Sequence, residues 1–308
     1  MGRPIRHYVQ DGMYFVTARA TQGRMLLRPS TQTNELIGGV LARAAQRFPV
    51  EVHGFVFTSN HVHLLLRARD GCLSAFMQFL LGNIARKVGR LVSWRNSFWE
   101  RRFSAEPVLD EIAAEDRLRY ILAHGVKEGL VRKVEQWPGI SCVAQLLGAR
   151  KRTFRWFHWA RRWRGRRIRE DALGLFDDAL AENVTLELKP LPAWSGLSDV
   201  ERRHRAQALI DDIEAKASEA FQAVIGAEKV SRQRPDHRPK RLERSPRPLC
   251  HAGTREGWLA WRDVHRAFKS MYRQASERYR RGDGVAKFPE LSFLPPRIRG
   301  LTISLAAI

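Results

Sequence analysis

The sequence predicts an α+β fold, in which helices pack on an antiparallel sheet, followed by a mainly α-helical, basic extension. Two observations support this class. Over the first 123 residues, the patterns follow the order strand, helix, strand, strand, helix, extended arm, helix. After about residue 150, charged residues and prolines become more frequent. Strands that return in this order favour an antiparallel sandwich over a doubly wound parallel sheet.

Each element of the first half has a local signal. Strands are indicated by runs of β-branched and aromatic residues, and helices by apolar residues spaced three and four apart. Ser59 and Asn60 separate two apolar runs and indicate a hairpin turn. In chain order, the predicted elements are a strand at 14–20, a helix at 33–48, strands at 50–58 and 62–68, a helix at 73–92, a hairpin or extended arm at 98–109 and a helix at 113–123.

The second half predicts helices at 199–225 and 256–281. Between them, residues 231–250 are rich in proline and arginine and predict extended chain, and the end after the last helix is expected to be irregular. The predicted organisation is therefore a sheet domain at 1–148, an aromatic-basic linker at 149–170 and an extension at 171–308.

Composition points to a nucleic-acid partner. Among 308 residues, 54 Lys and Arg face 32 Asp and Glu, which gives a formal net charge of +22. A hydrophobic fraction of 44% excludes wholesale disorder. No run of about 18 apolar residues predicts a membrane span, and the start does not resemble a secretion signal. Three cysteines without a C-x-x-C pair predict a cytoplasmic location and exclude a cysteine-based zinc module.

The segment 151–167 interleaves arginines with five aromatic residues. Aromatic rings stack on unpaired bases and guanidinium groups neutralise phosphates, so this composition suits single-stranded or structured nucleic acid. The alternative is an amphipathic helix whose aromatic side docks on the sheet domain, and the sequence leaves both open. The candidate contacts are Arg155, Trp156, Arg161 and Arg162.

A possible metal site begins in the second strand of the hairpin. His61 and His63 point to the same side of a strand because side chains alternate between its faces. In the following helix, Tyr120 and His124 are four residues apart and share a face. A third imidazole beside a phenol would complete a metal site next to a nucleophile. The alternatives are a chance histidine pair, a packing tyrosine and a histidine favoured by the helix C-terminus.

These residues carry a resemblance to a known family. Residues 59–66, SNHVHLLL, resemble the His-hydrophobic-His motif of HUH single-strand endonucleases. Residues 118–131, LRYILAHGVKEGLV, with Trp137-Pro138 after them, resemble the single-tyrosine block of REP-associated tyrosine transposases. The resemblance covers about residues 1–145, and the remainder is similar to a longer bacterial subgroup.

The resemblance implies a ferredoxin-like HUH nuclease domain and a transposase reaction on hairpin DNA of REP-like repeats, in the bacterial cytoplasm with the nucleoid. Tyr120 would attack a phosphodiester in single-stranded DNA, leaving a 5′-phosphotyrosine and a free 3′-hydroxyl. His61 and His63 would hold Mg²⁺ or Mn²⁺, with His124 as the third ligand. A free phenol, with a pKa of ~10, is a poor nucleophile at neutral pH, and a metal ion that neutralises the phosphate compensates for this.

The family also binds the foot of a hairpin through an N-terminal arm and basic residues of the domain. For each position here, the alternative is a solvated charge. The matching positions are Arg3, Arg6 and His7, and the further candidates for DNA contact are Arg19, Arg86, Lys87, Arg90, Arg101, Arg102 and Lys127.

Two positions depart from the family pattern. Relatives carry Asn-Pro where this chain has His124-Gly125, and Ser59 stands where proline is common. An imidazole at the third ligand position would shift the preference towards Mn²⁺ or another transition metal. The leading hypothesis is a single-strand DNA endonuclease and strand transferase. The rival is a domesticated binding protein without chemistry, and a third option is a ribonuclease or RNA-binding factor. The sequence leaves open whether the protein is a monomer or a homodimer.

Overall fold

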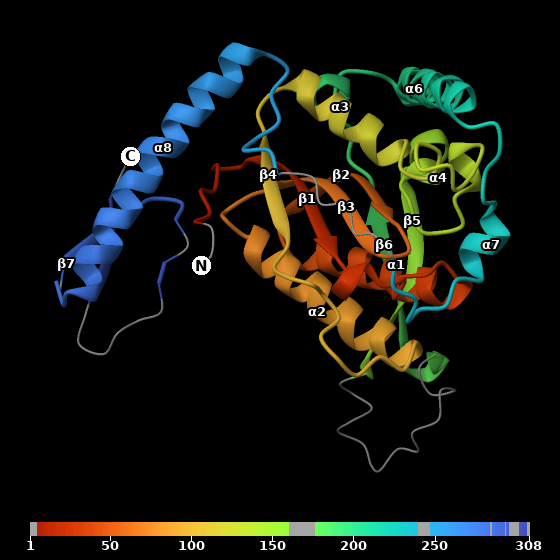
Figure 1. The fold of residues 1–308 in the computed structure, drawn as a ribbon, viewed down its shortest axis with the longest axis horizontal. Coiled ribbons are helices and arrows are strands. Elements are labelled where there is room, and N and C mark those ends of the chain that lie inside the picture. Colours follow the sequence, from red (N-terminus) through yellow and green to blue (C-terminus); the bar gives the residue numbers. More distant parts are fainter. Residues whose placement is uncertain are drawn as a thin grey trace, which may run out of the picture.

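The fold is built on a four-stranded antiparallel sheet that carries helices on both faces (Figure 1). The structure is a computed structural model that describes residues 5–159, 176–239, 247–283, 285–292, 294–295 and 302–306. The elements that form the sheet layer and its helices are β1 (Met13–Arg19), α1 (Thr31–Arg47), β2 (Val50–Phe57), β3 (His61–Ala68), α2 (Leu73–Leu91), β4 (Ser104–Val108) and α3 (Glu111–Leu122).

The strand order in the sheet is β2-β3-β1-β4, and every neighbouring pair is antiparallel. Helices α1 and α2 lie on one face of the sheet, and α3 lies on the other (Figure 1). The α+β class and the antiparallel sheet predicted from the sequence are therefore confirmed. The segment expected as a hairpin or arm at 98–109 contributes the edge strand β4.

The register of β1 against β3 decides which side chains share a face. Thr17 pairs with His63 and Arg19 pairs with His61. Cross-strand partners point to the same side of a sheet, so these four side chains lie on the α3 face. Val62, between the two histidines, points to the opposite face and is fully buried there.

Two helices begin two residues earlier than predicted, because the capping residues lie further upstream. The Ser30 side chain accepts a hydrogen bond from the Thr33 N–H and starts α1. The Asp110 side chain accepts one from the Ala113 N–H and starts α3. In both cases a side-chain oxygen satisfies an N–H that has no partner inside the helix.

The prediction of a linker at 149–170 is wrong for the residues of this range that the structure describes. Residues Lys151–Phe157 form strand β5, which pairs antiparallel with β6 (Ala181–Glu187) in a second sheet packed on α1. Phe154 and Phe157 are buried. The Phe154 ring packs against Gly38 of α1, and the Arg155 N–H donates to Glu35 Oε1 at 2.7 Å. The aromatic residues of this strand therefore stabilise the domain, while residues 160–175, with Arg161 and Arg162, lie outside the described residues.

The hydrophobic core does not end near residue 148. One cluster of buried side chains includes residues from Tyr8 to Val230, among them side chains of β6 and of α6 (Asp199–Ala220). Ion pairs join α6 to α3, one of them between Arg205 and Glu115 at 3.0 Å. The first part of the predicted extension thus belongs to the same folded body, and the helix expected at 199–225 is confirmed but ends five residues earlier.

The C-terminal part begins at the open edge of β4. The His251 N–H donates to the Pro107 carbonyl at 2.8 Å, and the His251 carbonyl accepts from the Leu109 N–H at 2.9 Å. Helix α8 (Arg255–Arg280) confirms the helix predicted at 256–281, and it projects beyond the sheet (Figure 1). The irregular end expected after it is wrong, because β7 (Val285–Pro289) pairs in parallel with β8 (Thr302–Ala306) beside α8.

Short helices connect these parts. They are η1 (Thr21–Gly23), η2 (Val134–Gln136), α4 (Val143–Leu147), η4 (Asp178–Leu180), η5 (Pro192–Trp194) and α7 (Ala227–Ser231).

No helix in the described ranges is long and apolar enough to cross a membrane.

The contact between α1 and β5 predicts a strong effect of Gly39→Ala. A Cβ at this position would overlap the backbone carbonyl of Arg155, which has no rotamer to adopt. We expect a loss of about 1–3 kcal/mol in the free energy of unfolding, measured by urea denaturation. The control is Gly82→Ala in α2, where the nearest heavy atom is a guanidinium nitrogen of Arg86 at 3.7 Å. That change should stabilise by up to about 1 kcal/mol, and equal effects of the two changes would contradict the packing.

Candidate metal and tyrosine site

Three histidines converge on the α3 face of the sheet. His61 and His63 come from β3, and His124 follows the C-terminus of α3. Their ligand nitrogens all lie within 4.8 Å of one another. His63 and His124 are buried, and His61 is half-buried. The structure therefore brings together the three residues that the sequence predicted as ligands.

Hydrogen bonds orient two of the imidazoles. His63 Nδ1 lies 2.9 Å from Thr17 Oγ1 on the neighbouring strand. His61 Nδ1 lies 2.6 Å from Asn60 Oδ1. A carboxamide oxygen only accepts, so His61 Nδ1 carries the proton and its Nε2 offers a lone pair. That Nε2 is in contact with His124 Nε2, so the two nitrogens converge as ligands of one ion do.

The environment keeps the imidazoles neutral. Loss of hydration on burial, followed by the nearby charges of Arg19 and Lys127, lowers the pKa of His61 to about 3. Burial likewise holds the pKa of His63 and of His124 well below the ordinary value. Neutral imidazole is the form that binds metal. The cluster can therefore hold a divalent metal ion, and its three nitrogen donors suit a transition metal better than Mg²⁺.

Tyr120 lies beside this cluster, half-buried and one helical turn before His124. Its ring centre is 5.3 Å from that of His63 and 5.5 Å from that of His124. The Lys127 ammonium lies 3.5 Å from the centre of the tyrosine ring, and the Arg117 guanidinium lies 5.2 Å from it. A phenol, a metal-binding cluster and two cations thus share one small region.

Sequence reasoning missed three neighbours of this site, and one of them is Arg117 beside Tyr120. The other two lie on β1. Thr17 is set opposite His63 by the strand register, and Phe15 stacks on the His63 ring at 5.1 Å. Phe15 also meets the ring of Tyr120 edge-on at 5.6 Å. The alternation of β1 places both residues on one face, so pairing β1 with β3 in the correct register would have found them.

The predicted DNA contacts fall into several groups. Arg19 lies at the end of β1 and Lys127 beside Tyr120, both close enough to lower the pKa of His61. Arg6 is half-buried, with its guanidinium 3.8 Å from the centre of the Phe103 ring. Arg3 lies outside the described residues. Four arginines of α2 and of the segment before β4 are exposed, namely Arg86, Arg90, Arg101 and Arg102.

Lys87 is not a surface contact, so its assignment as a phosphate ligand is wrong. The residue is buried, and its ammonium donates to the Phe157 carbonyl at 2.6 Å. The same ammonium lies 4.4 Å and 4.3 Å from the ring centres of Trp156 and Trp159. It therefore fastens α2 to β5.

Three other expected contacts are engaged within the chain. The Trp156 ring stacks on Phe79 at 5.8 Å in addition to its contact with Lys87. Arg155 pairs with Asp178 at 2.5 Å. His7 stacks on Phe268 of α8 at 3.9 Å. Their partners come from distant parts of the sequence, which local pattern cannot reveal, and the contact of these three residues with DNA stays a prediction.

The antiparallel sheet carries a His-x-His pair on a central strand and a tyrosine on the facing helix, as the motifs in the sequence predicted. Residues 19–124 match the family described as "Transposase IS200 like". A protein of Haemophilus influenzae described as a REP-associated tyrosine transposase is 24% identical over 144 residues, which cover 43% of this chain and 81% of that protein. The resemblance found in the sequence motifs is thereby confirmed.

Solved structures give weaker matches. A REP-associated tyrosine transposase bound to a REP hairpin aligns with a TM-score of 0.40 and 21% identity, over 46% of this chain and 82% of that one. A crystal structure described as a transposase from Deinococcus radiodurans aligns with a TM-score of 0.29 and 20% identity, over 39% and 95% of the two chains.

The bond between Thr17 and His63 predicts that Thr17→Val weakens metal binding. Valine keeps the shape of the side chain but cannot hydrogen-bond to Nδ1, so the imidazole loses its fixed orientation. We expect the affinity for Mn²⁺, measured by isothermal titration calorimetry, to fall by about 10–100-fold. Thr153→Val on β5, which removes a bond between two exposed threonine hydroxyls, is the control. Unchanged affinity in Thr17→Val would show that Thr17 does not orient the site.

The burial of Lys87 predicts a pH dependence of stability. Burial lowers the pKa of Lys87 to about 7, from 10.5. Between these values the unfolded chain holds a proton that the folded chain has released, so this residue makes the free energy of unfolding rise with pH. The slope is at most about 1.4 kcal/mol per pH unit.

Lys87→Met should lose this contribution, so the stability difference between the variant and the wild type changes between pH 7 and 10. Urea denaturation at several pH values measures it, with Lys229→Met at an exposed position as the control. Parallel stability curves for wild type and Lys87→Met would rule out a titrating Lys87.

Proposed function

We propose that this protein is a metal-dependent endonuclease and strand transferase that acts on single-stranded and hairpin DNA. The observation that carries the proposal is the position of Tyr120 beside three converging neutral imidazoles. The family match supports a transposase, and the relative bound to a REP hairpin suggests REP-like hairpins as the DNA. Such work would place the protein at the bacterial nucleoid in the cytoplasm.

His61, His63 and His124 would hold the divalent ion. When bound there, the ion supplies a positive charge that neutralises the scissile phosphate and the charge that develops on it. His61 and His63 contribute no proton transfer in this proposal, because their nitrogens are used for the ion and for the bonds to Asn60 and Thr17. Mn²⁺ is preferred to Mg²⁺ in this proposal because all three donors are nitrogen.

Tyr120 is the proposed nucleophile. Its oxygen forms a bond to phosphorus, the bond from phosphorus to the 3′ oxygen breaks, the phenol gives up its proton to solvent and the departing 3′ oxygen gains one. The products are a 5′-phosphotyrosine and a 3′-hydroxyl. Attack by another 3′-hydroxyl reverses the step and joins strands without ATP, because the phosphotyrosine keeps the bond energy.

Cations around the phenol would attract the DNA. Lys127 and Arg117 lie against the Tyr120 ring, where their positive charges would attract the phosphates of the DNA. Arg19 lies on the other side of the histidines, where it pairs with His61 in the strand register. The exposed arginines of α2 and of the segment before β4 extend the phosphate-binding surface, which makes affinity salt-dependent.

The test is Tyr120→Phe. The wild type, incubated with Mn²⁺ and a labelled hairpin from repeats that flank its gene, should form a covalent adduct that survives denaturation. Tyr120→Phe should form none, while its DNA affinity stays within about twofold, because only the nucleophilic oxygen is removed. Tyr272→Phe on α8 is the matched control and should form the adduct as the wild type does.

The outcomes separate the two hypotheses about chemistry. Adduct formation by Tyr120→Phe would assign the nucleophile elsewhere. Tight, salt-sensitive binding without any adduct in the wild type, across Mn²⁺, Mg²⁺ and several flanking repeats, would establish a binding protein without chemistry.

A further inference from the structure

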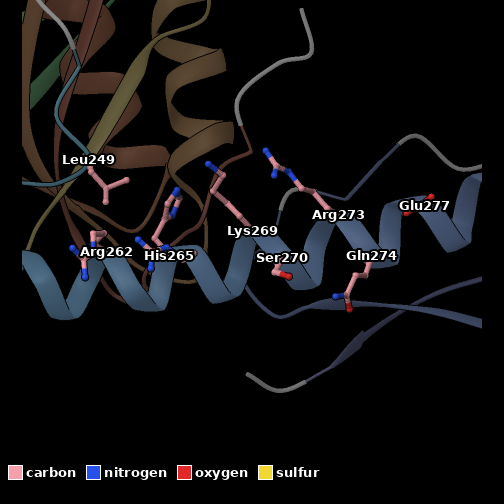
Figure 2. Close-up of a pocket in the computed structure, with 9 residues that line it drawn as sticks. Leu249, Arg262, His265, Lys269, Ser270, Arg273, Gln274 and Glu277 are labelled. Atoms are coloured by element: carbon pink, nitrogen blue, oxygen red, sulfur yellow. The ribbon is translucent and has the colours of Figure 1, made fainter.

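Helix α8 carries a stripe of basic residues that the catalytic site does not use. Arg262, Arg266, Lys269 and Arg273 stand at positions i, i+4, i+7 and i+11 and therefore share one side of the helix. Together with His265 they line a groove of about 440 Å³ along α8. Figure 2 shows Lys269 and Arg273 pointing to the same side of the helix, away from Ser270 and Gln274.

The stripe has more positive charge than its surroundings neutralise. Asp263 pairs with Arg262 at 2.9 Å and lies 3.7 Å from Arg266. Lys269 and Arg273 have no ion pair within the described parts of the chain. Glu277, which also lines the groove, is engaged by Arg281 from outside it. The groove thus offers two uncompensated cations in a row, which suits a polyanion.

The groove is continuous with basic residues of the sheet domain. Leu249, which lines the groove, follows Arg247 by two residues. Arg247 is close enough to Arg101 and Arg102 for their charges to lower its pKa, although burial is the larger cause. Burial, and after it the charges of Arg102 and Arg247, likewise lowers the pKa of Arg6 in the N-terminal segment. Arg101, Arg102, Arg247 and Arg6 therefore form a basic cluster between the segment before β4 and the groove, and Glu100 and Glu106 also lie near Arg247.

Stacking fixes α8 against the N-terminal segment. His7 lies between aromatic residues of the helix, with ring centres 3.9 Å from Phe268 and 5.0 Å from Trp261. The Tyr8 N–H also donates to the Leu291 carbonyl at 3.0 Å. The basic stripe is thus held at a set position beside Arg6 and does not depend on a hinge.

We propose that this groove binds the phosphate backbone of the duplex stem of the same DNA hairpin that the catalytic site processes. Of the described residues that line it, only His265 carries a ring, so the groove provides no row of aromatic platforms for unpaired bases and binds phosphate through charge. From Arg262 to Arg273 the helix rises by ~16 Å, about five base-pair steps of B-DNA. The proposal rests on the proposed function for its ligand, and it names the stem as the part bound.

The test compares two double variants that each remove two positive charges from α8. Lys269→Gln with Arg273→Gln removes the uncompensated pair of the groove. Arg278→Gln with Arg280→Gln removes two arginines that do not line the groove, and the first of them pairs with Asp283. Fluorescence anisotropy at several salt concentrations measures binding to a synthetic DNA hairpin, to its duplex stem alone and to a single strand of equal length. Circular dichroism confirms the helix content of each variant.

We expect the groove variant to reduce the slope of log K against log salt by about 2 for the hairpin and for the stem, because each lost phosphate contact contributes about 1. The control variant should keep the wild-type slope, and the groove variant should lower the slope for the single strand by less than for the stem. Equal slopes for wild type and the groove variant on the stem would overturn the proposal, and so would an equal loss on the single strand.

Adduct formation distinguishes this proposal from the catalytic one. The groove variant should still form the Tyr120 adduct at saturating hairpin concentration, since no residue of the stripe touches the site. A wild type that forms no adduct but shows the expected difference in slopes would refute the catalytic function and keep the stem-binding groove. If the wild type forms the adduct but wild type and groove variant have the same salt slope on the stem, the catalytic function is supported and the stem-binding groove is refuted.

Discussion

The site depends on the pairing of β1 with β3 in one register. That register sets Thr17 opposite His63 and places both histidines on the α3 face. A slip by one residue would turn the histidines towards the core beneath α1 and α2 and bring Val62 to the site. The fully buried side chains of Val62 and Leu64 prevent this, because exposing them would cost roughly 1.5–3 kcal/mol each. The packing of the core therefore fixes the geometry of the chemistry.

The cations around the histidine cluster favour neutral imidazoles but disfavour a bound metal ion. Arg19 and Lys127 disfavour protonated imidazole, which keeps His61 available to a metal ion. The same two charges would repel the ion itself, so an ion is most stable there when an anion accompanies it. In the proposed reaction, a phosphodiester would provide that anion.

The sequence could predict what depends on local periodicity. The alternation at 61–63 and the four-residue spacing of Tyr120 and His124 describe one strand and one helix face, and the structure has both. It could not predict β5, because the partner strand β6 starts 24 residues after β5 ends and the aromatic-basic composition is equally typical of a nucleic-acid-binding segment. Lys87 was misassigned for a related reason: its partners lie on β5 and just after it, so only the fold shows that it is buried.

The C-terminal half is built into the sheet domain at several points. His251 hydrogen-bonds to the edge of β4, which protects backbone groups that an open edge strand would leave unpaired. Phe268 stacks on His7, so α8 determines where the N-terminal segment lies. Because the extension holds this segment and covers the edge of β4, removing it would change the structure of the sheet domain as well as the total charge.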